Sequence, residues 1–185
     1  MKLLVVLVLV GALAACSQHA PSLEILGDIP QFDLVAQDGQ PFHSQVLAGK
    51  IWVADFIYTT CPGPCPRMTS QMREVQDALS TLPDVRLVSF SIDPANDTPS
   101  VLAAYAKVHG ASPAIWYFLT GSIPTLEMLD RDAFKLGNID GTMQHSTRFV
   151  LVDGKGKIRG YYDTSEASAI PKVIADINAL ARERT

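Results

Sequence analysis

The sequence predicts a single α/β domain of three layers, with helices packed on both faces of a central sheet. Two apolar runs of strand length, 51–58 and 85–92, have the composition of strands that are buried on both faces. Segments with apolar residues at helical spacing alternate with such runs, which is typical of α/β folds. Near the end of the chain, the strands Arg148–Val152 and 158–162 flank the turn-forming residues 153–157, and an amphipathic helix follows at 169–181.

The remaining elements follow from local signals along the chain. Segments 31–36 and 41–43, on either side of Asp38-Gly39, predict an N-terminal hairpin. The first apolar run leads into a predicted helix at 67–79. Thr98 as N-cap and Pro99 at the first helical position open a second helix that continues to about residue 109. A short strand at 116–119 and a helix at 123–134 complete the order.

The N-terminus predicts export. Lys2 precedes an apolar run at 3–10 that is too short for a permanent membrane helix. The segment from Leu13 to Cys16 resembles the cleavage site of a bacterial lipoprotein signal, which would leave Cys16 as a lipidated N-terminus; an ordinary secretory signal with an incidental cysteine is the alternative. We therefore expect a signal peptide of lipoprotein type at 1–15, a lipid-anchored tether at 16–28 and the folded domain at 29–185. The protein would be held on the membrane, facing the periplasm or the cell exterior.

The composition excludes some partners and indicates a redox environment. The chain has 185 residues, of which 48% are hydrophobic, enough for a sizeable core. Loss of the signal removes Lys2 from the 15 basic residues and none of the 19 acidic ones. A mildly acidic domain without a basic stripe argues against nucleic acid as a partner. Export places its thiols where disulfides persist.

The segment from Cys61 to Pro66, with the sequence CPGPCP, holds the only two cysteines of the expected domain. Proline is tolerated at the start of a helix but not inside it, so both thiols should lie near the N-terminus of the helix that follows. The helix dipole there favours the thiolate, which is the nucleophilic and metal-binding form. The four-residue spacing allows both sulfurs to face one way, and it brings their Cα atoms within about 7 Å, as a reversible disulfide requires.

Three further interpretations of the thiol pair can be compared. An inert disulfide staple is disfavoured because so short a loop contributes little stability. Structural zinc usually takes four ligands, and the expected domain has no second thiol pair. Two thiolates with one imidazole would suit Cu(I).

The chain has four histidines, and one of them follows a different pattern. His19 in the tether, His43 in the hairpin and His109 near a helix end are expected to be solvated surface residues. His145 lies in a polar loop, 141–146, that leads directly into the strand Arg148–Val152. Loops at strand ends surround the functional cleft of α/β sheets. The spacing alone leaves His145 open as either a metal ligand or an exposed loop residue.

Two aspartates also have two interpretations each. Asp55 alternates with Val53 and Ile57 and should therefore face the core. A buried carboxylate is costly unless it is paired, hydrogen-bonded or protonated, so Asp55 is either a proton acceptor for the thiols or a satisfied structural aspartate. Asp93 ends the second apolar run, where it would cap the next loop or supply an oxygen ligand to Cu(II).

The motifs together resemble a known family. Asp55-Phe56, with Cys61 at the sixth position after the aspartate, is similar to the strand that enters the active site of thioredoxins. Thioredoxins, however, separate their cysteines by two residues and place a proline before the opposite strand, which this chain lacks. Residues 56–66 (FIYTTCPGPCP), 91–94 (SIDP) and 97–99 (DTP), with His145-Ser146 before the strand at 149–152, resemble the Sco/SenC family across essentially the whole domain.

The resemblance implies a thioredoxin-like three-layer fold with a central mixed sheet and an N-terminal β-hairpin extension. It implies copper ligation by Cys61, Cys65 and His145, a redox-active Cys61–Cys65 pair, and a metallochaperone role in building the CuA centre of cytochrome c oxidase. The copper would be Cu(I), with Cu(II) as a further option. The expected partner is the CuA-bearing oxidase subunit or another periplasmic copper protein.

Other functions remain open at this level. The family also contains thiol reductants of oxidase subunits, so a thiol-disulfide oxidoreductase is the main alternative. A copper-buffering lipoprotein without dedicated delivery is a third possibility. A peroxidase is disfavoured, because the basic residue nearest to Cys61 in the sequence is Arg67 and nothing else there indicates an activated peroxidatic thiol.

Overall fold

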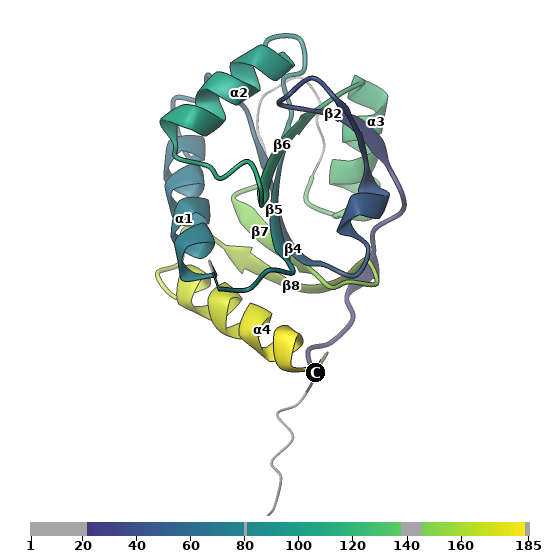
Figure 1. Cartoon of the computed structure of the whole chain (residues 1–185), viewed down its shortest axis with the longest axis vertical. Helices are drawn as coiled ribbons and strands as arrows, with labels where there is room; N and C mark the ends of the chain where they lie inside the picture. Colours follow the sequence, from purple (N-terminus) through teal and green to yellow (C-terminus); the bar gives the residue numbers. More distant parts are fainter. Residues whose placement is uncertain (1–21, 80, 138–145, 184–185) are drawn as a thin grey trace, which may run out of the picture.

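The computed structural model describes residues 22–79, 81–137 and 146–183. Within these residues, a sheet of eight strands in the order β1-β8-β7-β4-β5-β6-β2-β3 lies between two layers of helices (Figure 1). The strands are β1 Gly27–Asp28, β2 Asp33–Ala36, β3 Pro41–His43, β4 Ile51–Ile57, β5 Val85–Ser91, β6 Trp116–Thr120, β7 Arg148–Val152 and β8 Lys157–Asp163. The helices are α1 Cys65–Ala78, α2 Pro99–Val108, α3 Ile123–Glu127 and α4 Ala169–Glu183, with a 3-10 turn at Ser44–Leu47 and a π-helical segment at Met128–Ala133. The predicted three-layer α/β class, mixed sheet and N-terminal hairpin are confirmed.

The centre of the sheet is parallel, and this decides where a site can form. Strands β4, β5 and β6 run parallel, so their C-terminal ends meet at one edge. We call this the site edge, formed by residues 58–61, 92–97 and 121–122. Strand β7 runs antiparallel to β4, with Ala54 opposite Val150, so β7 begins at the site edge. Its first residue, Arg148, pairs in turn with Asp163 at the end of β8.

Strand alternation in β4 separates two apolar cores. Ile51, Val53 and Ile57 face the layer formed by α1, α2 and α4, whereas Trp52 and Phe56 face the layer that contains α3 (Figure 1). All seven residues of β4 are buried. Asp55 belongs by alternation to the first face and is therefore surrounded by core on the side of α1.

The start of α1 and the helix predicted at 123–134 differ from the prediction, and α4 continues two residues further, to Glu183. Helix α1 begins at Cys65, two residues earlier than expected, because Pro66 occupies the second helical position, where its missing N–H costs no hydrogen bond. The predicted helix at 123–134 divides into α3 and the π-helical segment that follows. The expected cap of α2 is confirmed, since the Thr98 hydroxyl accepts a hydrogen bond from the Val101 N–H at 3.4 Å.

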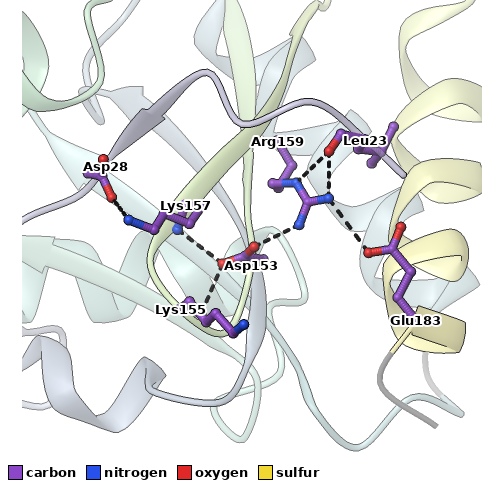
Figure 2. A network of polar contacts seen from close by, with 7 residues as sticks. All are labelled: Leu23, Asp28, Asp153, Lys155, Lys157, Arg159 and Glu183. Carbon is purple, nitrogen blue, oxygen red and sulfur yellow. Dashed lines mark hydrogen bonds and ion pairs between the residues drawn. The ribbon is translucent and has the colours of Figure 1, made fainter. Parts of the chain in front are cut away.

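The last residues of the expected tether lie against the sheet, at the edge opposite the site edge. Strand β1 pairs with β8, and the Arg159 guanidinium donates two hydrogen bonds to the Leu23 carbonyl, at 2.6 and 3.1 Å (Figure 2). Arg159 also pairs with Asp153 at 2.8 Å and with Glu183 of α4 at 3.6 Å. One side chain therefore joins the N-terminal segment, the β7–β8 turn and the C-terminal helix. No helix in the described ranges has the length and apolar character needed to cross a bilayer.

Replacing Arg159 with Met should destabilise the domain. The Arg159 and Asp153 side chains are only 9% and 13% exposed, and removing one partner of such a pair leaves the other charge poorly solvated, at a cost of about 3 kcal/mol. The free energy of unfolding from urea titration measures this. As a control, Lys157→Met breaks the more exposed Lys157–Asp28 pair and should cost less than about 1 kcal/mol. Equal losses of stability in the two variants would contradict the larger contribution expected of the buried Arg159–Asp153 pair.

Candidate copper and thiol-redox site

The two thiols lie at the junction between the central strand and the first helix. Strand β4 ends at Ile57, a short turn follows, and Cys65 is the first residue of α1. Cys61 is 7% exposed and Cys65 is fully buried, and neither forms a disulfide. The thiol pair therefore lies at the helix N-terminus, where the sequence predicted it.

Cys61 is the activated thiol of the pair. Burial alone would raise its pKa, but hydrogen bonds to its sulfur act in the opposite direction. The donors are the Cys65 thiol, the backbone N–H groups of Cys65 and Gly63, and the Tyr58 hydroxyl. Together they lower the pKa of Cys61 below its ordinary value, because each of them stabilises the thiolate.

Cys65 has the opposite character. Burial raises its pKa strongly, and the hydrogen bond that its thiol donates to Cys61 raises it further. Neighbouring negative charge on Cys61 and Asp55 adds to this effect. The hydrogen bond from the Tyr58 hydroxyl to Cys61 likewise raises the pKa of Tyr58. The site therefore favours ionisation of Cys61 before Cys65.

Asp55 provides a second ionisable group beneath the thiols. Its side chain is fully buried, and within the described residues neither carboxylate oxygen has a hydrogen-bond partner of normal geometry. Burial raises the pKa of Asp55 to about 7, although the nearby Ser89 hydroxyl lowers it slightly. Because its charge raises the pKa of Cys65, the carboxyl lies within electrostatic reach of the buried thiol. A purely structural buried aspartate needs hydrogen-bond partners for its carboxylate oxygens, and the described residues provide none of normal geometry for Asp55.

Asp97 holds the loop that leads to Cys61, a role that the sequence did not indicate. This buried carboxylate accepts hydrogen bonds from the Thr59 hydroxyl at 2.5 Å, the Thr59 N–H at 3.2 Å and the Ser91 hydroxyl at 2.6 Å. It therefore ties the β4–α1 loop to the end of β5. Asp93 accepts a hydrogen bond from the Asn96 side chain at 2.8 Å, in agreement with the interpretation that it caps its own loop.

Two predicted site residues, His145 and Cys16, lie outside the described residues, as does His19. The chain after His145 is described from Ser146 onward and enters β7 at the site edge. His43 is exposed and pairs with Asp33 at 2.8 Å, as expected for a surface histidine. Across the described ranges, no group of three or more His, Cys, Asp or Glu side chains gathers at a spacing suited to a metal ion.

His109 differs from the expectation of a solvated residue. It is only partly exposed, and its ring centroid lies 4.3 Å from that of Tyr105. Burial against α2 lowers the pKa of His109.

Comparisons with known proteins agree with this architecture. The SCO1/SenC family model matches residues 27–182. The SCO1 protein homolog of Bacillus subtilis is 34% identical over 173 residues, which cover 90% of each chain. A SCO1/SenC family lipoprotein from Bacillus anthracis superposes with a TM-score of 0.79 at 33% identity, covering 87% of this chain and 99% of that one.

Two further solved structures share the fold. BsSco, described as a member of the Sco family of cytochrome c oxidase assembly proteins with a disulfide switch, superposes with a TM-score of 0.76 at 33% identity, covering 86% of this chain and 97% of that one. ScoI of Bradyrhizobium japonicum, solved with copper bound, is 24% identical with a TM-score of 0.68, covering 83% of this chain and 99% of that one, and shows likeness of fold alone. The fold is thus the thioredoxin-like one that the sequence predicted. The chain belongs to the SCO1/SenC family.

Cys61 should react with iodoacetamide before Cys65. At pH 7 the lowered pKa gives Cys61 a larger thiolate fraction than Cys65, whose pKa burial raises, so the alkylation rates should differ by at least about tenfold. Mass spectrometry of tryptic peptides after brief alkylation of the reduced protein measures this. Tyr58→Phe removes one donor and should shift the Cys61 reaction to higher pH, whereas Tyr117→Phe, on β6, should not. Equal reactivity of both thiols would contradict the conclusion that Cys61 has the lower pKa.

Asp55→Asn should stabilise the protein by an amount that grows as pH rises from about 4 to about 7. The unfolded chain releases the Asp55 proton near the ordinary aspartate pKa of 3.8, whereas the folded protein holds it until about pH 7. The folded state thus binds more protons between these values, and wild-type stability falls as pH rises through that window. The variant should match wild type near pH 4 and exceed it by about 4 kcal/mol at pH 8, as urea unfolding would show. A difference that is constant with pH would contradict the buried, protonated carboxyl.

Proposed function

We propose that this chain is a copper metallochaperone that assists assembly of the CuA centre of cytochrome c oxidase. The observation that carries the proposal is the pair of thiols at the β4–α1 junction, Cys61 in the turn and Cys65 at the start of α1, with opposite pKa shifts, in a chain of the SCO1/SenC family. BsSco, which shares the fold at 33% identity, is described as a cytochrome c oxidase assembly protein.

The donor set suits copper as the cargo. Two thiolates are soft ligands, which favour Cu(I) over harder cations such as magnesium or calcium. The hydrogen bonds that stabilise the Cys61 thiolate also lower the proton competition that a metal meets at that sulfur. Transfer would proceed by exchange of these ligands for cysteines of the CuA-bearing subunit or of another periplasmic copper protein.

His145 is the proposed third ligand. The assignment comes from the family motif, in which a histidine and a serine precede this strand. It is supported by the start of β7 at the same edge of the sheet as the end of β4, since the chain that follows His145 enters the sheet at the edge where the thiols lie. An imidazole is compatible with copper in either oxidation state, and Asp93 offers an additional oxygen ligand for Cu(II).

We also propose that the protein is exported and anchored through a lipid on Cys16, facing the periplasm or the cell exterior. The signal-like segment at 1–15 supports this, and the Bacillus anthracis relative is named a lipoprotein. An exported position would place the thiols beside the extramembrane part of an oxidase.

Thiol-disulfide exchange is the second candidate function, and Asp55 is the observation that favours it. The Cys61 thiolate would attack a partner's disulfide and release one partner sulfur as a thiolate. Cys65 would then lose its proton and displace the second partner sulfur, which leaves a Cys61–Cys65 disulfide and a reduced partner dithiol. A carboxyl with a pKa of about 7 beside Cys65 is suited to accept that proton.

A Cu(I) titration separates the two functions. Reduced protein should bind one copper per chain tightly under anaerobic conditions, as measured against a competing chelator. His145→Ala should weaken binding by about a hundredfold or more, because a two-sulfur site loses its third donor. The partly buried His109 provides a matched control, since His109→Ala should leave the affinity unchanged.

The opposite outcomes are equally informative. Weak binding, or binding indifferent to His145, would overturn the three-ligand site and favour thiol-disulfide exchange. In that case Cys61→Ser and Cys65→Ser should each abolish reduction of a partner disulfide, whereas His145→Ala should leave it intact.

A further inference from the structure

Thr164, at the end of β8, joins three elements through one buried residue. It is 1% exposed. Its carbonyl accepts hydrogen bonds from the Arg67 guanidinium at 2.9 Å and from the Gln71 amide at 3.0 Å. Its hydroxyl and its N–H both donate to the Thr147 carbonyl, at 2.6 and 3.0 Å respectively. All the polar groups of Thr164 are thus used in contacts between elements.

These contacts connect the thiol turn with the chain that enters β7. Arg67 follows Cys65 by two residues, and Gln71 lies one helical turn further along α1. Thr147 follows His145 by two residues and immediately precedes β7. Because Arg148 pairs with Asp163, the Thr147–Thr164 contact continues the β7–β8 ladder by one residue beyond the strands. Thr164 is therefore hydrogen-bonded both to α1 and to Thr147.

The apolar packing does not require this junction. Helix α1 is held by Met68, Met72 and Val75 in the core, and β7 and β8 are held by their own ladder. The backbone N–H of Thr164 already satisfies the Thr147 carbonyl, so the hydroxyl adds a second, shorter bond to the same acceptor. Such added bonds between otherwise separate elements restrict their relative movement.

We infer that Thr164 is a positioning residue, whose hydroxyl holds the chain after His145 at a fixed place relative to the Cys65 turn. The inference rests on the proposed copper function. Its consequence is that the affinity contributed by His145 depends on the Thr164 hydroxyl, although Thr164 is not itself a ligand. A ligand on a held segment loses less conformational freedom when it binds, so release of the segment weakens binding.

A double-mutant cycle on the reduced full-length protein in detergent tests the inference. Thr164→Val replaces the hydroxyl with a methyl group at nearly constant volume and should weaken Cu(I) binding about fivefold to tenfold. Thr164→Ser keeps the hydroxyl and should bind as wild type. In the His145→Ala background, Thr164→Val should have no further effect on Cu(I) affinity, because Thr164 acts only through the binding free energy that His145 contributes.

The outcomes are distinguishable. If His145→Ala itself leaves the affinity unchanged, the proposed ligand set fails, and the inference fails with it. If His145→Ala weakens binding but Thr164→Val does not, the inference alone is overturned. Equal weakening by Thr164→Val in both backgrounds would also overturn it, since a general loss of structure does not depend on His145.

A second variant tests the junction from the helix side. Arg67→Met leaves Thr164 unchanged but removes one donor to its carbonyl, and it should weaken Cu(I) binding in the same His145-dependent way. Arg73→Met is the matched control on the same helix, since Arg73 contacts Gly110 and Asp77 instead and should leave the affinity unchanged. An equal effect of the two arginine variants would contradict the inference, and urea unfolding of each variant identifies a loss of folding.

Discussion

Strand β4 is buried on both faces, and its last residue is followed within four positions by Cys61. An apolar strand in the middle of a sheet cannot shift its register without exposing one of the two cores, so the turn that follows it has a fixed place. Asp97 strengthens this constraint by accepting hydrogen bonds from Thr59 and from Ser91 on the neighbouring strand. The position of the thiols relative to the sheet depends on these contacts.

The burial of these residues also gives the ionisable groups of the site different pKa shifts. Cys61 lies at the edge of the core, where N–H and O–H donors reach its sulfur, whereas Cys65 and Asp55 lie inside it, where charge is disfavoured. One thiol with a lowered pKa, one with a raised pKa and one carboxyl with a pKa of about 7 can serve metal binding or disulfide exchange. The proposed copper transfer and the alternative redox function therefore use the same electrostatic arrangement.

The two ends of the sheet carry different polar networks. At the site edge, Thr164 joins α1 to the start of β7 through neutral hydrogen bonds and one guanidinium. At the opposite edge, the Arg159 guanidinium joins the N-terminal segment to the β7–β8 turn and α4 (Figure 2). If Cys16 carries the anchor, this arrangement fixes the entry of the chain at the end of the domain away from the thiols.

The sequence by itself determined the fold class, the order of the helices and of the strands from β2 onward, and the thiol pair at the start of α1, because apolar periodicity and proline act locally. Strand β1, at Gly27–Asp28, was assigned to the tether, because two residues carry no period. Its motifs also determined the family. The start of α1 at Cys65 and the π-helical segment after α3 were missed, because local patterns do not resolve the phase of a helix end. Only the tertiary structure decided the roles of Asp97 and Thr164, whose partners lie 38 and up to 97 residues away. It also decided the opposite pKa shifts of Cys61 and Cys65, since these depend on burial and on donors that folding brings together.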